Sequence, residues 1–191
     1  MNKDNLLSAF KDTEALLNGH FLLSSGRHSE RYMQCAKLLQ YPDVATKIAE
    51  GIANHFEPKN ITCVIGPAMG GIIIAYKVAE ALGVRSVFGE REAGRMCLRR
   101  GFELKAGERV LVVEDVVTTG KSVKELLDVI KKENVDIAGV ASIIDRSGGK
   151  VDFGVEFFSL APIEIKTYQP DECPLCAKNI PVVKPGSRGI N

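Results

Sequence analysis

Residues 110–122, with the sequence V-L-V-V-E-D-V-V-T-T-G-K-S, constrain the fold of this chain more than any other segment. An apolar run ends in two adjacent acids, Glu114 and Asp115, and a Thr-Thr-Gly loop then leads into an amphipathic stretch. Its apolar side chains, Val123, Leu126, Leu127 and Ile130, recur at helical spacing. The pattern is typical of a buried strand that ends in two carboxylates and turns directly into a helix.

The chemistry of this turn favours a phosphorylated sugar. Free backbone N–H groups and the positive end of the helix dipole both attract an anion at the start of a helix. The two acids would repel a phosphate, but they suit sugar hydroxyls, which donate hydrogen bonds to carboxylates. An ordinary buried strand with a polar helix cap is the alternative, and it leaves the adjacent acids without partners. The candidate ribose 5-phosphate site consists of Glu114, Asp115, Val116, Val117, Thr118, Thr119, Gly120, Lys121 and Ser122.

The rest of the chain alternates between strand and helix patterns. We expect helices at 4–17 (ended by Gly19), 42–56, 71–82 (closed by Gly83) and 122–133, and strands at 20–23, 61–65, 84–88, 109–114 and 137–144. This order predicts an α/β fold, a doubly wound and mainly parallel sheet flanked by helices. Ligands bind such sheets at the carboxyl ends of the strands, where the polar loops of this chain lie.

Composition restricts the class of protein. The chain has 191 residues and a formal net charge of +1, and 45% of its residues are hydrophobic, so we expect one globular domain spanning 1–191. The balanced charge gives no argument for a nucleic-acid partner, and no apolar run is long enough to span a membrane. Five cysteines and a polar start favour a reducing, cytoplasmic location.

Two further loops have both a structural and a functional interpretation. The loop 66–71, G-P-A-M-G-G, is either a simple strand-to-helix turn or a backbone cradle for a second anion. Residues 89–101 hold four arginines and two glutamates between glycines. They are either a solvated hairpin or a mobile flap that closes over a substrate, and we favour the flap.

The run from Glu114 to Ser122 resembles the phosphoribosyl pyrophosphate signature of the type I phosphoribosyltransferases along its whole length. Within that superfamily the chain is most similar to the orotate phosphoribosyltransferases. Three segments carry that finer similarity, Ser25-Gly26-Arg27 with Ser29 and Tyr32, Arg91-Glu92-Ala93, and Ile144-Asp145-Arg146.

The resemblance implies a role for each matched residue. Residues 114–122 and Arg91 would bind phosphoribosyl pyrophosphate, and Ala68, Met69 and Gly70 would form the pyrophosphate loop. Orotate would lie against Thr118, Arg146, Ser25 and Gly26, under a small hood made mainly of residues 1–40 and C-terminal segments. Arg91 and Asp115 would be catalytic. Mg²⁺ would bind with the substrate, with Asp115 as its candidate protein ligand, and the chain would form a homodimer with shared active sites.

The chain also departs from the family. Gly70, Arg91 and Gly94 stand where many members have lysines, and Met96 stands where a histidine is common. Arginine can neutralise phosphate charge but does not readily donate a proton. A purine phosphoribosyltransferase and a non-catalytic sensor of phosphoribosyl pyrophosphate therefore remain open as alternatives.

The C-terminal Cys173-Pro174-Leu175-Cys176 has the spacing of half a zinc site. The sequence shows no second C-x-x-C or H-x-x-x-H, and the three histidines, His20, His28 and His55, show no pairing pattern. On spacing alone we expect neither a metal site nor a redox role here.

Overall fold

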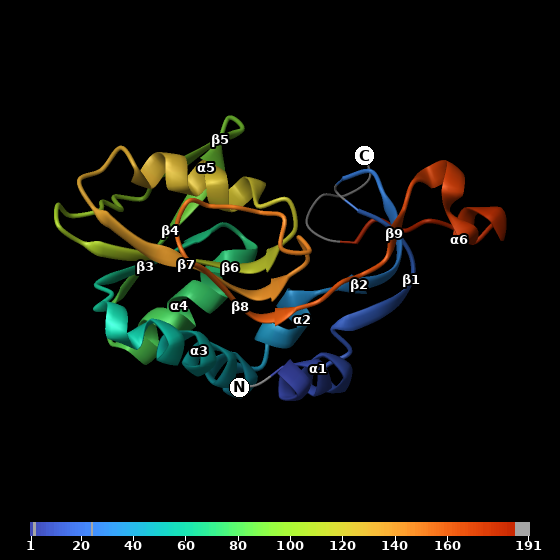
Figure 1. Cartoon of the computed structure of the whole chain (residues 1–191), viewed down its shortest axis with the longest axis horizontal. Helices are drawn as coiled ribbons and strands as arrows, with labels where there is room; N and C mark the ends of the chain where they lie inside the picture. The colour runs from blue at the N-terminus through green and yellow to red at the C-terminus, as the bar shows by residue number, and fades with distance from the viewer. Residues whose placement is uncertain (2, 24, 186–191) are drawn as a thin grey trace.

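A six-stranded sheet in the order β5-β4-β3-β6-β7-β8 forms the larger part of the molecule (Figure 1). The computed structural model describes residues 1, 3–23 and 25–185. The strands are β3 (Cys63–Pro67), β4 (Arg85–Glu92), β5 (Arg95–Leu98), β6 (Arg109–Val117), β7 (Asp136–Asp145) and β8 (Phe157–Pro162). Only the β4–β5 pair is antiparallel. The predicted α/β fold with a mainly parallel sheet is therefore confirmed.

Alternate residues of β6 bury their side chains in two separate cores. Val110 and Val112 pack in the core that contains α5 (Lys121–Ile130), whereas Leu111 and Val113 pack in the core that contains α3 (Pro42–Phe56) and α4 (Gly70–Leu82). Figure 1 shows α5 on one face of the sheet and α3 and α4 on the other. Side chains of a strand alternate between its two faces in this way. The same alternation makes the two adjacent acids at the end of β6 face different surroundings.

The predicted helices 42–56, 71–82 and 122–133 correspond to α3, α4 and α5; the bounds of α3 agree, α4 begins one residue earlier, and the ends of α5 differ by one and three residues. Gly83 closes α4 with a left-handed backbone (φ 67°), a conformation that glycine adopts without steric cost. The buried face of α3 consists of Ala45, Ile48, Ala49, Ile52, Ala53 and Phe56, which recur every three or four residues.

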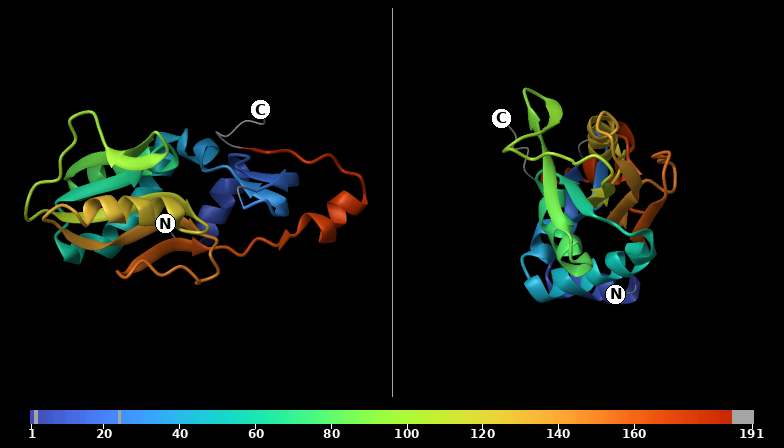
Figure 2. Two further views of the ribbon diagram at one scale, coloured as in Figure 1. Left: turned by 90° about the horizontal axis from the view of Figure 1, so that it is seen from above. Right: turned by 90° about the vertical axis from the view of Figure 1, so that its left-hand side faces the viewer.

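A second, three-stranded sheet lies beside the large one, in the order β1-β2-β9 (Figure 2). It contains β1 (Leu16–Leu22), β2 (His28–Met33) and β9 (Thr167–Tyr168), all antiparallel. Both ends of the chain therefore contribute to it. The short helix α2 (Cys35–Leu39) connects β2 to α3.

The prediction of one helix over 4–17 is wrong. Helix α1 spans only Lys3–Asp12, because Glu14 has a left-handed backbone (φ 51°) and the Ala15 N–H bonds back to the Phe10 carbonyl at 2.9 Å. That arrangement ends a helix. Leu16 and Leu17 are thus strand residues, and Gly19 lies within β1 rather than at a helix end.

Residues 89–101 fold mostly as a hairpin. Strand β4 runs to Glu92, turns at Ala93 and Gly94, which both have positive φ, and returns as β5. The remaining short elements are η1 (Glu57–Lys59), η2 (Pro170–Glu172) and α6 (Pro174–Ala177). Ser24, in the predicted turn before Arg27, and the end of the chain from residue 186 lie outside the described residues. The assignment of the whole chain to one domain stays a prediction.

Candidate active site

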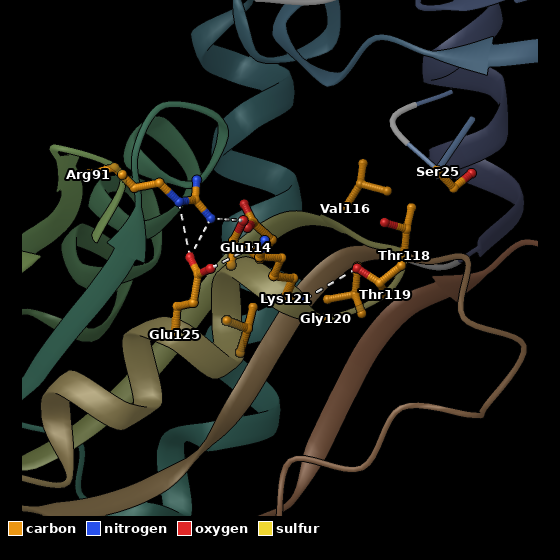
Figure 3. Close-up of a pocket in the computed structure, with 13 residues that line it drawn as sticks. Ser25, Arg91, Glu114, Val116, Thr118, Thr119, Gly120, Lys121 and Glu125 are labelled. Atoms are coloured by element: carbon orange, nitrogen blue, oxygen red, sulfur yellow. Dashed lines mark hydrogen bonds and ion pairs between the residues drawn. The ribbon is translucent and has the colours of Figure 1, made fainter. Parts of the chain in front are cut away.

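A pocket of about 520 Å³ opens where β6 ends and α5 begins (Figure 3). Its walls come from the end of β6, the start of α5, the β4–β5 hairpin and the β1–β2 turn. The lining residues are Ser25, Arg91, Gly94, Glu114, Val116, Val117, Thr118, Thr119, Gly120, Lys121, Ser122, Val123 and Glu125. Of the predicted 114–122 site, only Asp115 is not in this lining.

The loop before α5 forms one end of the pocket. Gly120 has a left-handed backbone (φ 71°), and a Cβ atom there would lie 2.7 Å from the Val151 side chain. Glycine therefore lets the chain turn tightly between β6 and α5. The first N–H groups of a helix have no partner within it, so the start of α5 offers donors at the pocket. This end of the pocket suits a phosphate.

The two acids at the end of β6 face different surroundings. Glu114 is buried at the pocket, and the Asp115 N–H donates to its Oε1 at 3.1 Å. Burial, and then repulsion by the Asp115 carboxylate, raise the pKa of Glu114 well above its usual range. Burial also raises the pKa of Asp115, although the Val116 N–H donates to its Oδ1 at 2.7 Å. Two crowded acids of this kind are suited to a ligand that donates hydrogen bonds or carries positive charge.

The glycine-rich loop after β3 lies against Asp115. A Cβ atom at Gly70 would lie 2.7 Å from both Asp115 carboxylate oxygens, and one at Gly71 would lie 2.9 Å from the Val113 carbonyl oxygen. The Ala68 N–H donates to the Gly89 carbonyl, and the peptide bond between Ala68 and Met69 is cis. Any side chain at residue 70 would therefore force the Asp115 carboxylate to shift.

Arg91 lies on the wall of the pocket in its own chain. Its guanidinium donates to Glu125 from Nε (3.0 Å) and Nη2 (2.5 Å), and to the Ser122 hydroxyl at 3.2 Å (Figure 3). The hairpin thus presents a cation beside the phosphate end. That this hairpin moves as a flap, or completes a partner's site, stays a prediction.

Arg146 follows β7 and is not part of the pocket lining. Its backbone N–H donates to the Val117 carbonyl at 2.8 Å, and burial lowers the pKa of its guanidinium. Its Nε is buried and has no hydrogen-bond partner among the described residues. Within the described residues, Arg146 also makes no ion pair with Asp145 or Glu164. Such a pair would be expected if Arg146 were a plain surface charge. Arg146 lies near Tyr32. Burial, and then the charge of Asp115, raise the pKa of Tyr32.

Among the described residues of the β1–β2 turn, Ser25 alone reaches the pocket. Ser25 lines it, opposite Thr118 in Figure 3, whereas Gly26 (φ 79°) does not. Arg27 points elsewhere, because its guanidinium donates to the Thr167 hydroxyl and carbonyl of β9, both at 2.9 Å. The sequence prediction missed Glu125, which pairs with Arg91. Its position four residues after Lys121, on the same side of α5, was the available signal.

The phosphoribosyl transferase domain model matches residues 35–153. The chain belongs to the phosphoribosyltransferase family. An orotate phosphoribosyltransferase of Caldicellulosiruptor bescii is 55% identical over 98% of this chain and 99% of its own length. One from Thermotoga maritima is 54% identical, over 93% and 95%.

Solved structures agree with this fold. The orotate phosphoribosyltransferase of Aeropyrum pernix matches with a TM-score of 0.71 at 27% identity, covering 83% of this chain and 93% of that one. An adenine phosphoribosyltransferase has a TM-score of 0.63 at 16% identity, over 80% and 99%, which shows likeness of fold alone. No helix in the described residues is long and apolar enough to cross a membrane.

Proposed function

We propose that this chain transfers the phosphoribosyl group of phosphoribosyl pyrophosphate to orotate, which yields orotidine 5-phosphate and pyrophosphate in pyrimidine biosynthesis. One observation carries the proposal: a single pocket combines a helix start suited to a phosphate with a buried acid suited to ribose hydroxyls. The family membership and the 55% identity to an orotate phosphoribosyltransferase over nearly the whole chain support it.

The bond from the anomeric carbon to pyrophosphate breaks, with its electron pair leaving on the pyrophosphate. A ring nitrogen of orotate forms the new bond to that carbon and gives up its proton to solvent. Residues 118–122 hold the 5-phosphate, Glu114 and Asp115 hold the ribose hydroxyls, and the loop 68–70 holds the pyrophosphate. Negative charge builds on the departing pyrophosphate, and Arg91 stabilises it once its contact with Glu125 gives way. Thr118, Ser25, Gly26 and Arg146 face orotate, whose carboxylate and carbonyl groups accept hydrogen bonds from a guanidinium.

The donors present fit Mg²⁺, which prefers oxygen ligands. Glu114 and Asp115 offer carboxylate oxygens beside the pocket, and burial raises the pKa of both groups. These residues would hold the ion together with the substrate. Bound there, Mg²⁺ supplies charge neutralisation for the diphosphate.

A homodimer is the second part of the proposal. Met69, Ile73 and Tyr76, which are 77%, 47% and 62% exposed, form an apolar stripe along α4 at helical spacing. Tyr76→Glu should shift the protein to a monomer in light scattering. Mixing Arg91→Ala with Asp115→Asn subunits then tests shared sites. Recovered activity supports sharing, and no recovery after verified exchange assigns Arg91 to its own chain's site.

The proposed location is the cytoplasm, since all five cysteines are free thiols.

The deciding experiment measures product from phosphoribosyl pyrophosphate with orotate, uracil, adenine and hypoxanthine in parallel. We expect product with orotate and with none of the other three bases. Product only with a purine base would overturn the base assignment, and binding without any turnover would indicate a sensor. Asp115→Asn should lower the rate by about ten- to a hundredfold, because a charge-assisted hydrogen bond contributes roughly 1.5–3 kcal/mol.

A further inference from the structure

Two histidines and two cysteines from distant parts of the chain meet in the small sheet, away from the pocket. His20 lies on β1, His28 begins β2, Cys173 precedes α6 and Cys176 lies within it. One possible ligand atom from each residue lies within 4.8 Å of every other. The C-x-x-C in the sequence is therefore not isolated, and the expectation that the histidines show no pairing is wrong for His20 and His28.

The distances suit a tetrahedral metal ion. Zinc bonds of about 2.3 Å to sulfur and about 2.0 Å to nitrogen put neighbouring ligand atoms about 3.3–3.8 Å apart. Cys176 Sγ lies 3.3 Å from His28 Nδ1 and 3.7 Å from His20 Nε2, and Cys173 Sγ lies 3.5 Å from His20 Nε2. The two ring nitrogens, 2.8 Å apart, are closer than this, and binding would separate them by about half an ångström.

The surroundings already orient the ligands. His20 Nδ1 lies 2.7 Å from the Ile180 carbonyl and donates to it, which leaves the lone pair of Nε2 directed at the cysteines. His20, His28 and Cys173 are buried, and Cys176 is half-buried. Outer hydrogen bonds of this kind fix the ring tautomer in metal sites, and burial keeps competing water away.

We infer that His20, His28, Cys173 and Cys176 form a structural zinc site that joins the C-terminal segment to the β1–β2 hairpin. Thiolate and imidazole ligands favour zinc over Mg²⁺ or Ca²⁺, which take oxygen ligands. All four positions belong to protein side chains, so none is left open for a substrate, as in structural rather than catalytic zinc sites.

The site would also steady part of the active site. Ser25, which lines the pocket, lies in the turn between His20 and His28. Cys173 is 153 residues from His20 along the chain. Besides the cluster, Val183 bonds to β1 through its N–H to the His20 carbonyl and its carbonyl to the Leu22 N–H, both 2.8 Å. A zinc ion would lock this long-range contact in place.

Zinc content of the untagged protein, purified without chelators, tests the inference by elemental mass spectrometry. We expect about one zinc per chain, lost in Cys176→Ser and in His28→Gln. Cys97→Ser and His55→Gln are matched controls that should keep the metal, because Cys97 lies on β5 and His55 bonds to Glu156. Zinc should raise the melting temperature of the wild type after chelation, but not that of Cys176→Ser.

If the variants do not fold, cobalt(II) added to the metal-free wild type decides the question. Tetrahedral thiolate coordination gives cobalt intense visible bands together with a thiolate-to-metal charge-transfer band, and their appearance supports the site. The inference is overturned if zinc-supplemented wild type binds no metal, if both ligand variants keep their zinc, or if Cys173 and Cys176 form a disulfide in the native protein.

Discussion

Gly70 and the Asp115 carboxylate are in such close contact that a Cβ atom at residue 70 would lie 2.7 Å from both carboxylate oxygens. Gly70→Ala should therefore displace Asp115 from the end of β6. A displacement of about 1 Å at a reacting site costs about a hundredfold in rate, so we expect kcat/KM to fall by about ten- to a hundredfold. Steady-state kinetics on the folded variant measure this.

Gly107→Ala is the matched control for added bulk and backbone strain. Gly107 has positive φ (80°) and open space around its Cα, so alanine there should lower the melting temperature but not the specific activity. Equal activity of Gly70→Ala and wild type would show that Asp115 tolerates the displacement, and would remove the reason for a glycine at residue 70.

Arg91→Ala should lower kcat by about ten- to a hundredfold, since a charged hydrogen bond to the departing pyrophosphate contributes roughly 1.5–3 kcal/mol. Glu125→Gln should instead strengthen binding of phosphoribosyl pyrophosphate, because it frees Arg91 from its ion pair. Arg85→Ala is the control: Arg85 pairs with Glu108 at the other end of β4 and should affect stability alone. Weaker binding in Glu125→Gln would mean that the pair positions Arg91 rather than competing for it.

Glu114→Gln should change how stability depends on pH. The pKa of Glu114 is raised in the folded protein, so the unfolded chain loses this proton first as pH rises above about 4.3. Wild-type stability therefore falls through the window between the unfolded and folded pKa values, and the fall is complete above the folded pKa. The neutral glutamine escapes this loss, although it should impair turnover.

Denaturant titrations of both proteins from about pH 4 upward give the difference directly. The stability advantage of Glu114→Gln should be absent at the acid end and grow with pH. A constant difference would mean that Glu114 ionises normally. In the wild type, binding of phosphoribosyl pyrophosphate with Mg²⁺ should also release protons, which calorimetry in buffers of different ionisation enthalpy detects.

Local patterns were enough to predict strands β3, β4, β6 and β7 of the large sheet and the turn that forms the pocket, but not β5 or β8. Val110 to Val113 form a continuous apolar run, which is typical of a strand covered on both faces, and α5 follows with strict helical spacing. The prediction of a phosphate site at residues 118–122 is local in the same way, because it depends on one turn between one strand and one helix.

Features that depend on contacts distant in sequence could not be predicted. The end of α1 depends on Glu14 adopting a left-handed backbone, which residue type does not announce, since glycine is the usual choice there. The meeting of His20 with Cys173 requires β1 and the C-terminal segment to dock across most of the chain. Spacing rules for metal sites detect only ligands that are close in sequence.

Arg146→Ala should raise the KM for orotate strongly while leaving affinity for phosphoribosyl pyrophosphate, measured by calorimetry, nearly unchanged. The reason is the buried Nε of Arg146, which has no partner among the described residues and is free to donate to an acceptor on the base. Lysine should restore only part of the affinity, because it lacks the planar fork that binds a carboxylate with two parallel bonds.

Arg109→Ala is the control for loss of an arginine whose Nε is buried without a hydrogen-bond partner. Arg109 also has a buried Nε without a hydrogen-bond partner, but it lies at the opposite end of β6 and pairs with Asp136 at 3.4 Å. Its loss should leave the KM for orotate unchanged. If Arg146→Ala binds orotate as tightly as the wild type does, Arg146 does not contact the base, and a purine becomes the stronger candidate for the acceptor. If instead both arginine variants weaken orotate binding equally, the effect is one of general stability rather than of recognition.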